Sequence, residues 1–429
     1  MTPEIKTRIE QIHRGEVPEG YKKGKLGIVP DEWENIAFST LFTSTSDYTD
    51  DLEKYPLYSL TIEDGITPKT KRYERSHLVK KEDSYKIVKP NDYAYNPMNL
   101  RFGAVARHKG NISVVVSGYY DIFTTVHKSD LPFMDSFLTC GMMVTYYNRI
   151  STGSLVEKQR VHFSQFLDFA LPLPPLTERA KIATILTTQD RVIELKGNLL
   201  AEKQRQKKYL MQQLLTGKKR LPGFNEEWEI KPLKHISEKQ KKKNLCFQYS
   251  LVFSNSAQHG IILQDQEFDK EIANGERIDR YYIVVPGAFV YNPRISVTAP
   301  CGPINVNDTG EIGIMSPLYT VFIILFSDIN QDYMKYYFQS SCWHKYVKGV
   351  ANYGARHDRI SISDEDFFAM PINLPPNEEQ AAIAEVLSTA DCEIDLLRQS
   401  IEQEKQKKKA LMQLLLTGIV RVNTWMKKR

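Results

Sequence analysis

The sequence predicts an α+β fold, with two mixed α/β globular parts joined by two long helices that form an antiparallel coiled coil. Two observations carry this prediction: a tandem duplication, and a heptad pattern inside the duplicated segments. Residues 173–221 align without a gap on residues 374–422, at a shift of 201 positions, and 22 of the 49 aligned residues are identical. A repeat of this length is far longer than a solenoid unit and indicates a duplicated domain. We therefore expect a pseudo-two-fold tandem duplication.

Length and composition are those of a globular protein with more than one domain. The chain has 429 residues, of which 41% are hydrophobic and 25% charged, and its net charge is +5. No apolar run approaches the roughly 18 residues that span a bilayer, and the first residues lack the apolar core of a secretory signal. The five cysteines form no CxxC pair, which favours a reducing compartment. We expect a cytoplasmic protein with no membrane partner.

Each duplicated segment is predicted to be one long helix. A double proline opens each copy, at 174–175 and 375–376, and proline is tolerated only at a helix start. Each copy ends in Leu-Thr-Gly, where Gly217 and Gly418 suit a left-handed cap. About 40 residues lie between these limits, so each continuous helix would be about 60 Å long.

The apolar residues of both copies recur in heptads, which is typical of a coiled coil. The two copies are each other's obvious partner, and an antiparallel pairing would place the globular parts at opposite ends. The alternative is two unrelated amphipathic core helices, which leaves the matching heptads unexplained. The residues expected to pair the helices are Leu186, Ile193, Leu200, Leu214, Leu387, Ile394, Ile401 and Leu415.

The globular parts are predicted to be rich in strands. Runs of β-branched and aromatic residues at 112–116, 122–126, 281–285 and 319–326 are bounded by glycine, proline and asparagine. Short helices are expected near 332–339 and 364–368. The resulting domain boundaries are a first globular part at 1–172, a first helical region at 173–217, a second globular part at 218–371 and a second helical region at 372–429.

Catalytic and metal-binding motifs are absent from the sequence. There is no GxxxxGK[ST], HExxH, GxSxG or GxGxxG, and the nine histidines show no metal-ligand spacing. We therefore assign no catalytic residue, no metal ligand and no cofactor to this chain. The sequence predicts a binding protein.

Polar and basic clusters in glycine-containing loops favour nucleic acid as the ligand. Lysine and arginine bind phosphates, whereas base edges are contacted by arginine at guanine and by asparagine or glutamine at adenine. The alternatives are a solvated face for the lysine runs, including the run at 239–243, and turn chemistry for asparagine beside proline. The candidate DNA-binding residues are Lys71, Arg72, Asn96, Asn99, Arg101, Arg107, Lys109, Asn292, Arg294, Ser296, Thr298, Tyr353, Arg356 and Arg359.

The chain also resembles a known family. The motifs GYKK and IVPDEW near the start are followed by LPPLTERAKIATILTTQD and LMQQLLTGKKRLPGF, and the helical motifs recur in the second copy. These motifs resemble those of the specificity subunit of type I restriction–modification systems. The likeness covers nearly the whole chain and is most specific in the two helical regions.

The resemblance implies a DNA-recognition subunit without catalytic activity. Its two globular parts would be target-recognition domains, each binding one half of a bipartite, asymmetric site in double-stranded DNA. The helices would set the distance between them and dock two modification (methyltransferase) subunits, to which restriction (endonuclease and translocase) subunits can be added. S-adenosylmethionine, ATP and Mg²⁺ would belong to those partners. Two alternatives from other classes are a self-contained DNA-modifying enzyme with diverged motifs and a coiled-coil scaffold that does not bind DNA.

Overall fold

The structure is a computed structural model that describes residues 3–69, 85–153, 159–264, 275–325, 328–352 and 358–422. The chain divides into two compact units. The first consists of Met1–Gly197 together with Ser400–Arg429, and the second of Asn198–Gln399. Each unit therefore combines one globular part with one half of each long helix. Among the described helices, none is both long and apolar enough to cross a membrane.

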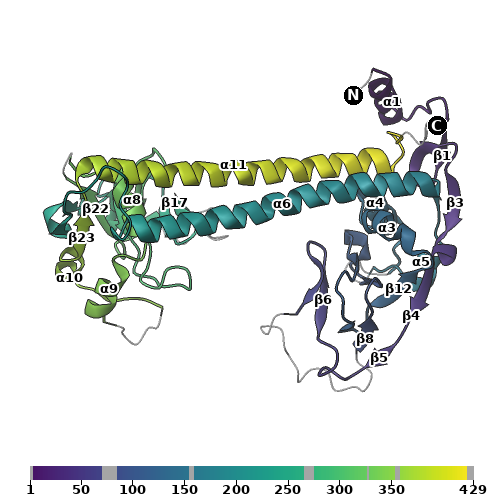
Figure 1. Ribbon diagram of the computed structural model, residues 1–429, viewed down its shortest axis with the longest axis horizontal. Coiled ribbons are helices and arrows are strands. Elements are labelled where there is room, and N and C mark those ends of the chain that lie inside the picture. The colour runs from purple at the N-terminus through teal and green to yellow at the C-terminus, as the bar shows by residue number, and fades with distance from the viewer. Residues whose placement is uncertain are drawn as a thin grey trace. The chain divides into compact units, whose positions relative to one another are not determined.

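The two long helices are continuous (Figure 1). Helix α6 (Leu176–Leu214) has 39 residues and α11 (Asn377–Leu416) has 40, which corresponds to about 60 Å each. Each begins at the residue after its double proline, as predicted. Gly217 and Gly418 have φ values of 69° and 73°, so the predicted left-handed caps are confirmed. Glycine at 418 is needed for a second reason, because a Cβ there would lie 2.5 Å from Cδ of Pro30.

The first unit is built around a four-stranded antiparallel sheet. The order of its strands is β10 (Val105–Arg107), β9 (Tyr93–Tyr95), β12 (Asp121–Thr125) and β4 (Phe42–Thr45). A second sheet contains the strands β11 (Val114–Ser117), β8 (Tyr85–Val88) and β5 (Tyr48–Thr49). The remaining described strands form three two-stranded pairs, which are β1 (Tyr21–Gly24) with β2 (Gly27–Pro30), β3 (Glu34–Ala37) with β13 (Ala170–Leu173), and β6 (Tyr58–Thr61) with β7 (Gly65–Pro68). The shorter helices are α1 (Pro3–His13), α2 (Phe38–Leu41), η2 (Leu100–Phe102), η3 (Lys128–Asp130), α3 (Leu131–Phe137), α4 (Gly141–Ile150) and α5 (Phe163–Leu167).

The second unit contains a corresponding four-stranded sheet. Its four-stranded sheet has the order β15 (Ser237–Lys239), β22 (Thr320–Ile324), β19 (Phe289–Tyr291) and β20 (Ile304–Val306). Two-stranded pairs join β18 (Tyr282–Val284) to β21 (Gly313–Met315), β14 (Glu229–Pro232) to β23 (Pro371–Leu374), and β16 (Phe253–Ser256) to β17 (Gly260–Leu263). Its short helices are η5 (Leu233–His235), η6 (Gly275–Arg280), α8 (Gln331–Gln339), α9 (His344–Val350) and α10 (Asp364–Phe368).

The duplication is therefore a duplication of fold. Strands β4, β12, β9 and β10 of the first unit correspond in order and direction to β15, β22, β19 and β20 of the second. The strands predicted at 112–116, 122–126, 281–285 and 319–326 are β11, β12, β18 and β22, and the predicted short helices are α8 and α10. The predicted fold class is confirmed.

The ends of the long helices are buried in the globular cores. In the first unit Leu186 of α6 and Leu415 of α11 lie in one hydrophobic cluster with the rings of Phe123 and Phe166. In the second unit Leu214 and Leu387 occupy the corresponding cluster. The other predicted pairing residues are less uniformly covered, because two helices alone enclose only a narrow seam. Ile394 is buried, and the half-buried residues are Ile193, Leu200 and Ile401.

Within each unit the two half-helices run antiparallel and are joined by charged contacts. In the first unit Lys196 donates to Glu404 at 2.8 Å, and Lys408 pairs with Asp190. In the second unit Lys203 pairs with Glu393 at 2.7 Å and Lys207 with Asp391 at 2.5 Å. In both units the residue numbers rise along α6 as they fall along α11, which is the antiparallel order that the sequence predicted.

Glu404 makes this pairing sensitive to acid. Hydrogen bonds from Lys196 and Gln189 lower the pKa of Glu404 from 4.5 to about 2. A carboxyl whose pKa is lowered by folding adds stability above its unfolded pKa and loses it as the pH falls toward the folded value. Relative to wild type, Glu404→Gln should therefore have a lower urea midpoint at pH 6, and the difference should shrink as the pH falls below 4.5. Exposed Glu385→Gln is the control, and a difference independent of pH would contradict the assignment.

In the first unit a buried glutamate connects segments that are far apart in the sequence. Glu178 at the start of α6 has none of its surface exposed, and Arg421, just beyond α11, donates two hydrogen bonds to it at 2.7 and 2.9 Å. The indole of Trp33 donates a third at 3.3 Å, and Glu32 accepts a further bond from Arg421 at 2.8 Å. A buried carboxylate is stable only when charged partners replace its lost hydration, and here they do.

The second unit contains the same arrangement at the duplicated positions. Glu379 is fully buried and accepts two hydrogen bonds from Arg220, both at 2.6 Å, and one from the indole of Trp228 at 3.0 Å. The guanidinium of Arg220 also lies over the Trp228 ring, 5.5 Å from its centroid. Each unit thus contains an Arg–Glu–Trp cluster around a buried glutamate, and the two clusters are formed by corresponding residues of the two duplicated halves.

Candidate DNA interface

The candidate DNA-binding residues cluster after two equivalent strands, β9 in the first unit and β19 in the second. Each of these strands ends in Tyr-Asn, followed by proline, and the chain then leaves the sheet in a loop. Four predicted residues, Lys71, Arg72, Tyr353 and Arg356, lie outside the described residues. The others can be placed.

In the second unit the structure brings Asn292, Arg294 and Arg359 together. The backbones of Arg294 and Arg359 form an antiparallel bridge, although the residues are far apart in sequence. Asn292 orders the loop from inside, because its Oδ1 accepts from the amide of Arg294 at 3.0 Å and its Nδ2 donates to the carbonyl of Asn255 at 3.0 Å. Both arginines lie 3.8 Å from Asp358, and the Arg294 side chain is 60% exposed. The two guanidinium groups are therefore close together and accessible.

Ser296 and Thr298 lie in the same loop and hold a valine outward. Their hydroxyl groups are 3.1 Å apart, and the Ser296 Oγ accepts from the amide of Ala299 at 3.1 Å. Val297 between them is completely exposed. Hydroxyl groups can donate to or accept from base edges, and an aliphatic group can contact the thymine methyl in the major groove. Sequence analysis did not single out Val297, since a valine signals contact only when its exposure is known.

In the first unit Asn96 and Arg101 are held by local contacts, and Asn99 is exposed. The Asn96 Oδ1 accepts from the amide of Met98 at 3.0 Å, which is the turn chemistry considered for asparagine beside proline. Arg101 lies in η2, its guanidinium 4.5 Å from the centroid of Phe102 and its Nη1 donating to Gln159 at 3.1 Å. Its buried Nε has no hydrogen-bond partner among the described residues. The side chain is thus oriented without being fully paired.

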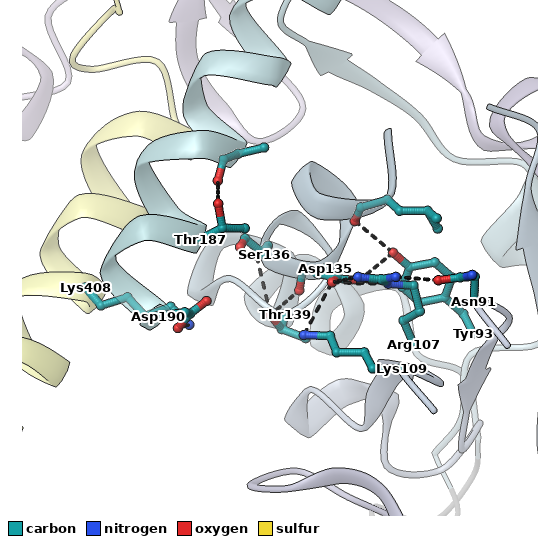
Figure 2. A network of polar contacts seen from close by, with 12 residues as sticks. Asn91, Tyr93, Arg107, Lys109, Asp135, Ser136, Thr139, Thr187, Asp190 and Lys408 are labelled. Carbon is teal, nitrogen blue, oxygen red and sulfur yellow. Dashed lines mark hydrogen bonds and ion pairs between the residues drawn. The ribbon is translucent and has the colours of Figure 1, made fainter. Parts of the chain in front are cut away.

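Arg107 is engaged inside the first unit (Figure 2). Its Nε and Nη2 donate to the two carboxylate oxygens of Asp135 at 2.9 and 2.7 Å, and its Nη1 donates to Asn91 at 2.6 Å. The hydroxyl of Tyr93 donates to the same carboxylate at 2.7 Å. Lys109 lies 3.4 Å from Asp135, but its side chain is 69% exposed. Of the two predicted contacts, the exposed Lys109 can turn from its long ion pair toward a phosphate, whereas Arg107 would have to give up a buried bidentate pair.

The electrostatics of this network favour the paired state. Burial by itself would raise the pKa of Asp135, but the hydrogen bonds from Arg107 and Tyr93 outweigh it, and the pKa is lowered. The same pairing raises the pKa of Arg107 in spite of its burial. Both groups therefore stay charged, and the ion pair fixes the end of β10 against α3.

Among the described residues no group of three or more histidine, cysteine or acidic side chains is placed to hold a metal ion. The described arrangement offers hydrogen-bond donors, acceptors and positive charge on exposed loops of two similar scaffolds. This combination can bind a polyanion and distinguish base edges.

Comparison with known proteins gives a consistent result. Residues 225–406 match the family model described as "Type I restriction modification DNA specificity domain". The chain is 25% identical over 445 residues to a protein of Methanocaldococcus jannaschii named "Putative type I restriction enzyme MjaX specificity subunit", an alignment that covers 95% of this chain and 98% of that protein.

Two solved structures are also similar. One, from work titled "Structural basis underlying complex assembly and conformational transition of the type I R-M system", has a TM-score of 0.55 at 14% identity and covers 91% of this chain and 99% of the other. The HsdS subunit of Thermoanaerobacter tengcongensis gives a TM-score of 0.47 at 16% identity, over 94% and 98% of the two chains. The first of these shows a shared fold.

Proposed function

We propose that the chain is a specificity subunit of a type I restriction–modification system, the family whose model its residues 225–406 match, and that it binds a bipartite, asymmetric site in double-stranded DNA, with one globular part on each half-site. Members of this family are the non-catalytic DNA-recognition subunits of their complexes. In this proposal each globular part is a target-recognition domain. Its loops contact base edges, and its lysines and arginines position it on the phosphates.

The observation that carries the proposal is one topology with two different loops. After the shared Tyr-Asn-Pro, the first unit forms the 3₁₀ turn η2, which presents Arg101, whereas the second forms an open loop that presents Arg294 and Val297. Equivalent positions on equivalent scaffolds thus carry different donors and apolar groups. Two domains of this kind would recognise different half-sites, and an asymmetric site is the consequence.

We further propose that two modification subunits dock on the helical regions. The long helices expose large apolar side chains that an isolated helix pair would not need, among them Leu195, Leu199, Tyr209 and Leu396. In the first unit a cavity of about 880 Å³ lies between α11 and α4, with Met412, Met142 and Tyr146 among its lining residues. Such surfaces are typical of protein interfaces.

In this proposal the chemistry belongs to partner subunits. S-adenosylmethionine would be bound by the modification subunits, and ATP and Mg²⁺ by restriction subunits where these join the complex. The complex would act in the cytoplasm, where its DNA is. The contribution of this chain is to select the DNA sequence and hold its partners there.

The experiment that tests the proposal is to map modified bases in DNA exposed to the chain together with its modification subunits. We expect one motif with two different half-sites at a constant spacing. Absence of sequence-specific modification and of specific binding, or a single undivided motif, would contradict the proposal.

The half-site assignment can be tested with a matched pair of variants. Arg101→Ala is expected to relax specificity in one half-site only, and Arg294→Ala in the other, because a bidentate arginine–guanine contact contributes about 1–3 kcal/mol of discrimination. Modification of DNA libraries randomised in each half-site measures both effects. If either variant relaxed the base specificity of both half-sites equally, or of neither, the assignment of one domain to each half-site would be wrong.

A further inference from the structure

A second loop of the second unit begins next to the loop that carries Arg294. Strand β15 pairs antiparallel with β22 through Ser237↔Ile324 and Lys239↔Phe322, and β19 pairs antiparallel with the other side of β22. Strands β15 and β19 are therefore parallel to each other, and their carboxyl ends lie at the same edge of the sheet. One strand separates them, so the two loops start about 10 Å apart.

We call residues 241–248 the lysine loop, and its base is firmly anchored. The amide of Ile283 donates to the carbonyl of Lys242 at 2.9 Å, and the amide of Asn244 donates to the carbonyl of Tyr281 at 3.0 Å. The side chain of Asn244 is buried and bridges the loop, because its Nδ2 donates to the carbonyl of Tyr249 at 2.8 Å and its Oδ1 accepts from the Tyr249 amide at 3.0 Å. The position of the loop is thus determined by the fold.

The tip of the lysine loop presents apolar side chains to solvent. Leu245 is 69% exposed and Phe247 is 57% exposed. The φ of Phe247 is +53°, a left-handed conformation that a bulky residue rarely adopts and that costs energy. The buried Asn244 holds this conformation, because the amide of Phe247 donates a hydrogen bond to the backbone carbonyl of Asn244 at 3.0 Å. Nothing in the described core requires these two side chains, so their outward position points to a partner.

The charge of the lysine loop identifies that partner. Lys241, Lys242 and Lys243 are all exposed, and none forms an ion pair with another described residue. Lys239, just before them, is by contrast bound by Asp364 at 2.6 Å. A cavity of about 440 Å³ lies beside these lysines. Three unpaired cations next to a loop of base-contacting type complement a phosphate backbone.

The first unit has no such loop at the corresponding place. The segment that follows β4, residues 46–53, contains Asp47, Asp50, Asp51 and Glu53 and no lysine. Carboxylates repel phosphates, so this segment cannot take the same role. Among the described residues, the lysine loop therefore has no counterpart at this place in the first unit, and the duplication did not preserve it here.

We propose that the lysine loop is a DNA-backbone clamp of the second half-site, in which three lysines bind phosphates while Phe247 and Leu245 pack against the sugars and base edges beside them. This inference rests on the proposed DNA binding of the second globular part. Apolar side chains pressed against base steps next to phosphate-binding lysines are an established way of holding DNA. The clamp adds affinity, whereas Arg294 and its neighbours supply sequence specificity.

The lysines are tested by replacing all three with glutamine in the full chain, assembled with its modification subunits. The log–log salt slope of target binding should fall by about 2.7, and affinity should fall roughly 100-fold at 0.15 M salt, equally for target and unrelated DNA. A control with the same loss of charge replaces exposed Lys218, Lys219 and Lys234, and should leave the slope close to that of wild type. An unchanged slope in the lysine-loop variant would overturn the proposal.

The apolar tip is tested with Phe247→Gly, because glycine accepts the positive φ and folding is not put at risk. Binding to target DNA should weaken about tenfold with an unchanged salt slope, as expected for loss of an aromatic contact. Ile230→Ala is the matched control, since Ile230 is 67% exposed on β14, a strand that pairs with β23. Equal effects in both variants would remove the assigned role of Phe247.

A natural thiol reports on the loop directly. Cys246 lies within it and is exposed, and Cys392 on α11 is an exposed internal reference. Saturating target DNA should protect Cys246 from maleimide and leave the rate at Cys392 unchanged. Protection of Cys246 by the modification subunits alone, without DNA, would instead assign the loop to a protein interface and overturn the proposal.

If the wild-type complex binds DNA specifically but the variants bind it equally well, only the clamp proposal fails. If the wild-type complex binds no DNA specifically, the proposed function itself fails.

Discussion

Replacing Arg421 by alanine is expected to lower the free energy of unfolding of the first unit by about 2–4 kcal/mol. The substitution leaves the fully buried Glu178 without its cation, because Arg421 donates two of the three hydrogen bonds that hold this carboxylate. The loss should lie below that of a wholly buried pair, since the Arg421 side chain is 28% exposed. Urea unfolding of the full chain, with hydrogen exchange to localise the change, measures it.

The duplication supplies the matched variant. Arg220→Ala removes the cation of Glu379 in the second unit, so its exchange protection should fall there and not in the first unit. Arg398→Ala is the control, because its pair with Asp395 is exposed on both sides and should contribute under about 1 kcal/mol. Similar small effects in all three variants would mean that the Arg–Glu–Trp clusters do not stabilise the units.

Deleting one heptad from each long helix is expected to shorten the preferred DNA spacer by about 3 base pairs. Seven residues correspond to about 10 Å of helix, and one duplex turn of about 34–36 Å contains roughly 10 base pairs. Residues 194–200 and 396–402 are suitable, because Lys196 bonds Ser400 in the antiparallel pairing. A whole heptad also returns the apolar residues to nearly the same face.

Mapping modified bases for this double deletion gives the spacer directly. The half-site sequences should be unchanged, because no recognition loop is altered. Deleting the heptad from α6 alone is the informative comparison, since it breaks the register of the helix pair and should lower activity at every spacing. An unchanged spacer in the double deletion would show that the helices do not set the distance.

The helical framework was predictable because its signals are local. The double prolines, the closing glycines at 217 and 418 and the heptad leucines each act on residues within one or two turns, and the sequence displays them in order. Duplication reinforced the prediction, because the same pattern recurs at a fixed shift. Strands β11, β12, β18 and β22 were predicted for the same reason, to within a few residues at their ends, whereas the other described strands were not singled out.

The candidate site was predictable only as to region. Tyr-Asn-Pro in both halves marked the two loops, and in the second unit the structure places the predicted residues from Asn292 to Thr298 together with Arg359. The engagement of Arg107 by Asp135 could not be predicted, because the two residues come from different elements, β10 and α3. A local pattern shows that a guanidinium is present but not whether a carboxylate lies opposite it.

The sequence by itself therefore determined the duplication, the two long helices and the positions of the two candidate loops, since each depends on composition and spacing along the chain. Only the tertiary structure decided which charges are paired and which are free. Arg421 meets Glu178 across 243 positions, and three lysines that the sequence alone would place on a solvated face lie beside the loop of Arg294. The physical reason is that electrostatic pairing and exposure depend on distances in space, which the linear spacing of residues does not contain.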